Sequence, residues 1–323
     1  MTAGPVHPPP PGQRSHLGTF RRRRQAALSL TETLLSISLC MPLVLGATKL
    51  LCTSVAEQAR SHQRLLMELN TQYVLSAIVK VVELAGHTDP LSGAARLTEP
   101  RLYGWDDATL AARTDIAVGK SGAGPFGSDV LIVRFMSSTT APGHALNCAG
   151  MPVPAAAGTA GQPIQEQGYS VFYVARGADG ENEFRCKYRT ATGWDSEALV
   201  QGVESFQVLY GLDRDADGRP DQFVRASAIS EEIRVGVSET SLWNQVVALK
   251  IALLMCSTQR LQRTPALVRW DLFGEDYSAL HANEDRGTML TSDHFSVERQ
   301  HRLRRSYEQL IFLRNPVYRV ALR

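Results

Sequence analysis

The sequence of 323 residues lacks the short motifs that mark many enzymes. It has no His-Glu-x-x-His zinc motif, no Gly-x-Ser-x-Gly nucleophile motif and no Gly-x-Gly-x-x-Gly loop between a predicted strand and a predicted helix. Its five cysteines include no Cys-x-x-Cys pair, which disfavours a zinc site or a thioredoxin-like redox centre. We therefore expect that the protein is not an enzyme.

Acidic residues are absent from residues 1–27, where five arginines occur: Arg14, Arg21, Arg22, Arg23 and Arg24. The formal net charge of the chain is +2, so the remaining residues are slightly acidic. A nucleic-acid-binding protein needs basic residues clustered on its folded part, and the sequence shows no such cluster there. We expect no nucleic-acid partner.

A mainly apolar stretch follows the arginines and runs from Leu28 to about Cys52. Its length of about 25 residues is sufficient for a helix to cross a bilayer. The arginines before it keep the leader cytoplasmic by the positive-inside rule, and the rest of the chain then lies across the membrane. An ordinary secretory signal would have a shorter apolar core that ends at a small-residue cleavage site.

The helical pattern continues past the apolar stretch. Apolar residues recur at steps of three and four positions as far as Leu84, with polar residues between them. A helix from Leu28 to Leu84 would be about 85 Å long. Pro42 should kink or locally melt this helix, and Gly86 should end it.

From about residue 88 the pattern changes to short segments rich in β-branched and aromatic residues. These segments predict strands at Val130–Met136, Tyr169–Arg176, Phe184–Arg189, Val203–Leu212, Gln222–Ala226, Val246–Leu254 and Leu310–Leu313. Residues 141–162 are predicted to be a surface loop, and the polar residues 271–306 an inserted loop region. The prediction is an α+β chain with a basic leader (residues 1–27), a long helix (residues 28–86, transmembrane over about 28–52) and a β-rich globular domain (residues 87–323).

One carboxylate interrupts the apolar stretch. Glu32 lies in its first turns, where an unpaired charge costs a few kcal/mol. Two interpretations stay open: the carboxylate reaches the lipid headgroups, or it meets a cation when the helix packs against other helices.

The residues around this carboxylate, Ala27 to Leu35, resemble the class III signal of type IV prepilins. In that family a small residue precedes the cleavage site, an apolar residue follows it, and a glutamate is fifth in the mature chain. The resemblance implies that a prepilin peptidase cuts between Ala27 and Leu28, that Leu28 is N-methylated, and that Glu32 pairs with the N-terminal amine of a neighbouring subunit. The chain departs from the family in having Ala27 where Gly is usual and in its long leader.

Later segments resemble PilW-like minor pilins: Leu66–His87, Val203–Gly211 with Asp213–Gly218, Val246–Leu254 and Leu313–Asn315. The resemblance is sparse between residues 88 and 200. It implies a type IV pilin-like fold, in which the long N-terminal helix packs on an antiparallel β-sheet. It also implies a structural role in type IV pilus assembly, and so in twitching motility and cell adhesion.

The implied partners are prepilin peptidase, other minor pilins, the major pilin and a tip adhesin. The implied location is the inner membrane, crossed once with the C-terminal domain in the periplasm, and then the pilus at the cell surface. Two other functions stay open. One is a minor pseudopilin of a type II secretion system, and the other is a bitopic periplasmic binding module that keeps its leader and enters no filament.

An acidic loop lies between two predicted strands and contains Asp213, Asp215, Asp217, Gly218 and Asp221. Alternate carboxylates in a tight loop converge on one point, which suits a hard cation such as calcium. The spacing matches positions 1, 3, 5, 6 and 9 of an EF-hand loop, but Val224 replaces the glutamate at position 12. Calcium is therefore the one cofactor that the sequence suggests, and a solvated acidic turn is the alternative.

Export would place Cys148, Cys186 and Cys256 in an oxidising compartment. We prefer a disulfide between Cys148 and Cys186. Ordinary buried thiols are the alternative, because sequence alone does not give connectivity.

Overall fold

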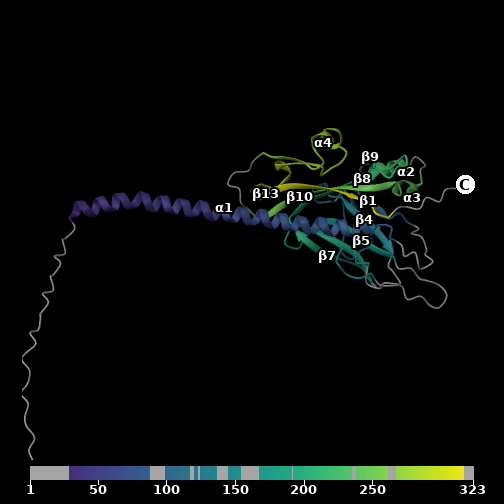
Figure 1. Ribbon diagram of the computed structural model, residues 1–323, viewed down its shortest axis with the longest axis horizontal. Helices are drawn as coiled ribbons and strands as arrows, with labels where there is room; N and C mark the ends of the chain where they lie inside the picture. Colours follow the sequence, from purple (N-terminus) through teal and green to yellow (C-terminus); the bar gives the residue numbers. More distant parts are fainter. Residues whose placement is uncertain are drawn as a thin grey trace, which may run out of the picture. The chain divides into compact units, whose positions relative to one another are not determined.

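The computed structural model describes residues 29–87, 99–116, 120–122, 124–136, 145–153, 167–190, 192–234, 238–260 and 267–315 (Figure 1). The chain divides into two compact units, residues 1–55 and residues 56–323. Ala27 and Leu28, the residues of the expected cleavage site, lie outside the described residues.

Helix α1 covers Leu30–Leu84, which confirms the long helix that the sequence predicts. The helix continues through Pro42, so the predicted local melting is not observed there. It ends as predicted at Gly86, whose φ of 73° is left-handed and suits glycine. The Gly86 N–H donates to the Arg134 carbonyl (2.9 Å), so the end of the helix is fastened to a strand.

The second half of α1 has a buried stripe. Val74, Ile78 and Val82 follow at four-residue steps and are fully buried. They belong to the main core, which also takes side chains from the inner faces of both large sheets. The apolar pattern predicted for this part of the helix is therefore its contact face with the β-rich part of the chain.

The first large sheet is antiparallel and has the strand order β1-β4-β5-β6-β7. Its strands are β1 (Leu102–Trp105), β4 (Val130–Met136), β5 (Gln167–Arg176), β6 (Asn182–Thr190) and β7 (Gly193–Gln201). Alternate side chains point to opposite faces of a strand. On β4, Leu131 and Val133 enter the main core, whereas Ile132 lies on the other face.

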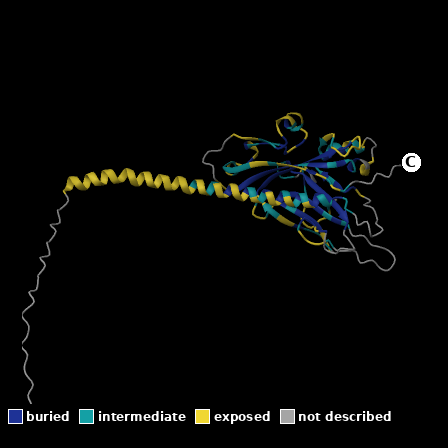
Figure 2. Cartoon of the chain, in the orientation of Figure 1, coloured by how far each residue is buried: buried dark blue, intermediate teal, exposed yellow. Residues whose placement is uncertain are grey.

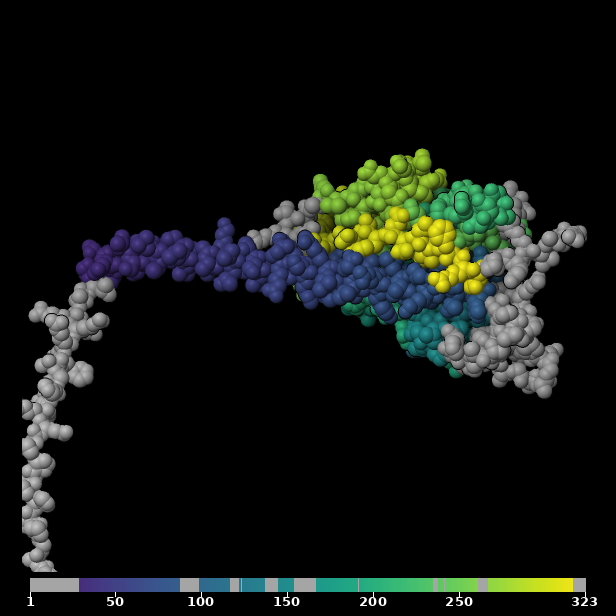
Figure 3. Space-filling model, in the orientation of Figure 1, coloured from purple at the N-terminus to yellow at the C-terminus, as the bar shows by residue number. Residues whose placement is uncertain are grey.

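The second large sheet is also antiparallel, with the order β13-β10-β8-β9. Its strands are β13 (Arg302–Phe312), β10 (Val246–Arg260), β8 (Val203–Leu212) and β9 (Gln222–Val224). Strand β13 lies along α1, as the yellow and blue surfaces of Figure 3 show, and the Tyr307 hydroxyl donates to the Glu68 carboxylate (3.0 Å). These sheets and the long helix confirm the α+β fold class.

Smaller elements complete the described residues: β2 (Ala108–Thr109), β3 (Lys120–Ser121), η2 (Pro125–Gly127), α2 (Ala226–Arg234), α3 (Glu239–Trp243), β11 (Arg269–Asp271), α4 (Glu275–His281), β12 (Met289–Thr291), η3 (Ser292–His294) and α5 (Val297–Gln300). Two predictions for the residues after the long helix were wrong. Ala226 begins α2 and does not belong to the preceding strand. Residues 271–306 are not a loop region, because they contain α4, β12, η3, α5 and the start of β13.

The wrongly predicted region folds because it has an apolar cluster of its own, which we call the outer cluster. It packs against the face of β8 and β10 that lies opposite the main core. Its buried members are Leu209, Ala252, Leu254, Leu272, Phe273, Leu290 and Phe295. The predicted surface loop at residues 141–162 falls mostly outside the described residues.

The last described residues return to the end of α1. The side-chain amide of Asn315 donates to the carbonyls of Glu83 and Ala85, both at 3.0 Å. Arg101 donates to the Asn315 carbonyl and to the Val246 carbonyl. The end of the helix, the start of β10 and the end of the described chain are thus joined by hydrogen bonds between distant segments.

Candidate functional site

The first turn of α1 contains Glu32, the carboxylate singled out in the sequence. The Ser29 N–H donates to Glu32 Oε2 (3.4 Å), and the Glu32 N–H donates to Ser29 Oγ (3.3 Å). This is the reciprocal pattern of a capping box, which satisfies two free donors at a helix start. Glu32 therefore has a local structural partner in the single chain.

The residues that follow are apolar and exposed in the single chain. The large apolar side chains from Leu30 to Leu51 are 59% to 78% exposed (Figure 2). Within the described residues, α1 is the helix that is long and apolar enough to cross a membrane. So large an apolar surface requires a cover of lipid or of other helices.

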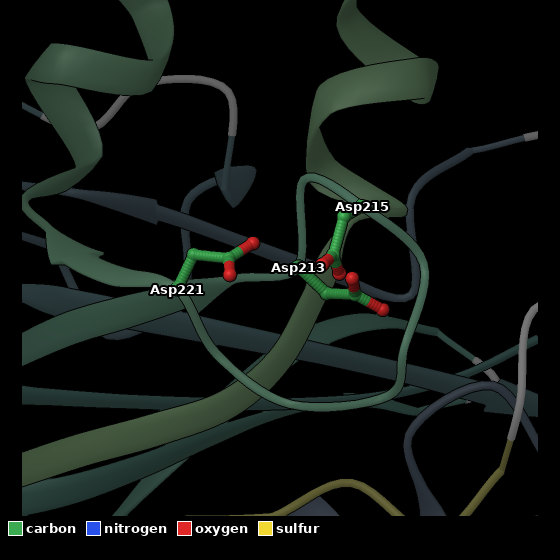
Figure 4. A group of neighbouring side chains, drawn as sticks. All are labelled: Asp213, Asp215 and Asp221. Atoms are coloured by element: carbon green, nitrogen blue, oxygen red, sulfur yellow. The ribbon is translucent and has the colours of Figure 1, made fainter.

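The acidic loop joins the end of β8 to the start of β9. Asp213, Asp215 and Asp221 each bring one carboxylate oxygen to within 4.8 Å of the others (Figure 4). Asp213 is buried, and the other two are exposed. A metal ion could reach these three oxygens from solvent, which is the arrangement that a loop binding a hard cation requires.

The backbone of the loop holds Asp213 in place. Its Oδ1 accepts the Ala216 N–H (2.6 Å), and its Oδ2 accepts the Gly218 N–H (3.0 Å). Gly218 has a φ of 87°, so the glycine provides the left-handed conformation that the turn needs. Each oxygen keeps a further lone pair that could bind a cation.

The structure brings together three of the four predicted ligands and leaves out Asp217. The Asp217 Oδ1 accepts the Arg219 N–H (2.7 Å), and this carboxylate is not in the close group. Arg214, in the same loop, pairs with Glu232 of α2 through two contacts of 2.6 and 3.0 Å.

Cys148 and Cys186 form a disulfide, which is the pair preferred from the sequence. Both residues are buried in the main core. Cys256 is a buried free thiol, and burial raises its pKa to about 12. A thiol with so high a pKa is almost wholly protonated at neutral pH and is a poor nucleophile.

A cleft of about 550 Å³ that the sequence analysis did not predict lies on the outer face of the first sheet. Four aromatic residues line it: Tyr103, Trp105, Tyr169 and Trp194. The sequence predicted the strand of Tyr169 but not β1 or β7, which carry the other three residues. The cleft forms only because strands that are distant in the chain pair in one sheet.

Comparison with known proteins gives one match. Residues 171–315 match the family model of PilW, described as Type IV Pilus-assembly protein W. No curated protein and no solved structure matches the chain. The matched residues begin in β5 and end at Asn315, so they include the acidic loop, the whole second sheet and the outer cluster. Over this part the chain is PilW-like and is similar to a protein of type IV pilus assembly.

Proposed function

We propose that this protein is a structural minor pilin that takes part in starting type IV pilus assembly and has no catalytic role. One observation carries the proposal: a domain with a PilW match follows a helix whose first half is apolar and more than half exposed. The lipid bilayer would cover this surface before assembly, and the helices of other minor pilins and of the major pilin would cover it in the filament.

The proposed route begins in the inner membrane, with one span and the C-terminal domain in the periplasm. Prepilin peptidase would cut between Ala27 and Leu28, and the new amine of Leu28 would be methylated. Glu32 lies close to this expected end, and a neighbouring subunit's amine would supply the cation that its carboxylate needs in an apolar environment. The mature chain would then leave the membrane and join the pilus, where a tip adhesin is an expected partner.

The capping box allows a sharp test of the role of Glu32. Glu32→Gln keeps an acceptor for the Ser29 N–H and removes the charge, whereas Ser29→Ala removes the cap and keeps the charge. If Glu32 serves assembly, Glu32→Gln should strongly reduce pilus number in a deletion strain, and Ser29→Ala should change it little. The reverse order would assign Glu32 to helix capping and contradict the proposal.

The mature N-terminus is a second test. Mass spectrometry of protein purified from membranes should give a chain that starts with methylated Leu28. An intact leader that retains Arg24 and Ala27 would favour the bitopic binding module. The pseudopilin is favoured by a different result: the protein is processed correctly, but deletion of its gene abolishes protein secretion and leaves the pili intact.

We also propose that the acidic loop binds calcium, on the basis of the three carboxylates that meet there. The ion would stiffen the connection between β8 and β9. Calorimetry with calcium chloride should detect binding to the parent chain and none to Asp215→Ala. Asp217→Ala is the matched control, because its carboxylate lies outside the close group and its loss should preserve binding. Absence of heat for the parent at millimolar calcium would reject the site.

A further inference from the structure

The outer cleft of the first sheet has a regular arrangement of side chains. In the register of the sheet, Arg134 on β4 lies opposite Tyr169 on β5, and Arg189 on β6 lies opposite Trp194 on β7. These four strands are neighbours in the sheet, and neighbouring strands are about 4.8 Å apart. Guanidinium and aromatic groups therefore alternate in a row across four strands.

The four aromatic side chains that line the cleft form two contacting pairs. Tyr169 and Trp194 meet edge to face, with 5.2 Å between their ring centroids. Tyr103 and Trp105 form a second such pair on β1, at 5.5 Å. All four side chains are half-buried, so each is held by its neighbours and still reaches the cleft. Two fixed aromatic pairs provide flat apolar surfaces at separate places in one hollow.

The guanidinium of Arg134 lines the cleft and is held by neighbouring protein groups. Its Nη1 donates to the Pro100 carbonyl (2.8 Å), and its Nε lies 3.0 Å from the Glu99 carboxylate. It also lies 5.7 Å from the centroid of the Tyr169 ring. Arg134 is therefore largely occupied by the protein, whereas Arg189 is exposed at the edge of the cleft.

The charges of the cleft nearly balance. Three carboxylates, those of Glu99, Asp115 and Glu239, line it together with the guanidiniums of Arg134 and Arg189. A polyanion such as a nucleic acid would meet the carboxylates, and a cationic peptide would meet Arg189. Aromatic faces surrounded by both acceptors and donors instead suit a neutral ligand that has apolar C–H faces and many hydroxyl groups.

We propose that this cleft is a binding site for a neutral carbohydrate. The C–H faces of sugar rings would stack on the aromatic side chains, and the carboxylates and Arg189 would hydrogen-bond the hydroxyls. The volume of about 550 Å³ lies within the range of pockets that bind small ligands. This activity goes beyond the proposed role in assembly, because the cleft shares no residue with the first half of α1.

The test uses the full chain in nanodiscs of phosphatidylcholine, since detergents with sugar headgroups would compete. The probes are lactose, cellobiose, maltose and chitobiose, each titrated singly and followed by saturation-transfer NMR and by tryptophan fluorescence. At least one disaccharide should bind saturably. Trp194→Ala and Arg189→Ala should each weaken that binding about tenfold, the effect of losing one stacking or hydrogen-bonding partner.

Arg189→Ala keeps the test valid if Trp194→Ala does not fold, because Arg189 is exposed. Phe312→Ala is the matched control: it removes an aromatic ring that is 54% exposed and does not line the cleft, and it should leave affinity unchanged. Failure of all four disaccharides to bind the parent would overturn the proposal. So would binding that survives both cleft substitutions, or binding of heparin or a basic peptide in place of the sugars. Piliation of the Arg189→Ala strain reports separately on the proposed assembly role and should be normal.

Discussion

Replacing Asn315 should show how strongly the end of the described chain holds the long helix. Its amide donates to the carbonyls of Glu83 and Ala85, which lie at the end of α1, where the last carbonyls lack partners within the helix. Asn315→Ala removes both hydrogen bonds. At about 1 kcal/mol each, the loss in the free energy of unfolding is about 2 kcal/mol.

Asn315→Asp should cost more, about 3 kcal/mol. A carboxylate cannot donate hydrogen bonds to the two carbonyls, and it would place a negative charge beside the negative end of the helix dipole. The neighbouring Arg314→Ala is the control. Its side chain is 71% exposed and pairs with Glu83 (2.7 Å), and such surface pairs contribute about 0–1 kcal/mol.

Thermal unfolding, followed by the fluorescence of the fully buried Trp243, measures these differences. For a domain of this size, 2 kcal/mol corresponds to a decrease in Tm of about 4–8 °C. The expected order of Tm is Arg314→Ala, then Asn315→Ala, then Asn315→Asp, from high to low. An Asn315→Ala protein that unfolds within 1 °C of the parent, or an Asn315→Asp protein more stable than Asn315→Ala, would refute the reasoning.

Two further variants test other parts of the fold. Replacing both Cys148 and Cys186 by alanine removes a disulfide that joins residues with a sequence separation of 38. The greater entropy of the unfolded chain should lower the free energy of unfolding by about 4 kcal/mol. A reductant should lower the Tm of the parent similarly, and an unchanged Tm would contradict this. Burial, with the charge of Asp106, raises the pKa of Asp285 from 3.8 to about 7. The folded state then binds more protons than the unfolded state between these values, so stability should fall as the pH rises from about 4 to about 7 and then level off. Asp285→Asn should reduce that fall in urea titrations at several pH values, and an unchanged pH profile would exclude Asp285 as its source.

The elements that the sequence predicted best carry a local signal, which is helical periodicity in α1 and β-branched or aromatic content in β4 and β8. In α1, Val74 and Ile78 recur at the helical step because only one side of the helix enters the core. The structure gives strands β4 and β8 the bounds predicted from their β-branched and aromatic residues, Val130–Met136 and Val203–Leu212. Strand β7 was missed because it is mostly exposed or half-buried and is not rich in β-branched and aromatic residues. Its place follows from pairing with β6.

The candidate sites divide in the same way. The acidic loop could be predicted because all its ligands lie within nine residues, so local geometry brings Asp213, Asp215 and Asp221 together. The aromatic cleft could not, because Tyr103 and Trp194 meet it from opposite edges of a five-stranded sheet. The order in which the strands pair brings the two residues to one cleft, and the sequence around either residue gives no sign of that order.

Strand β10 nevertheless contained evidence against the wrongly predicted loop. Its residues 246–256 are apolar on both faces except for Lys250, and a strand with so continuous an apolar run needs cover on each face. In the structure, Ile251 and Leu253 enter the main core, while Ala252 and Leu254 enter the outer cluster. Among the described residues, neither the helix α1 nor the first sheet contributes a member to the outer cluster. The outer face of β10 therefore needed cover from another part of the chain. The polar segment after β10 provides it through a few large apolar residues spaced between many charged ones. A continuous apolar strand thus predicts a folded cover even where the covering sequence itself shows no periodicity.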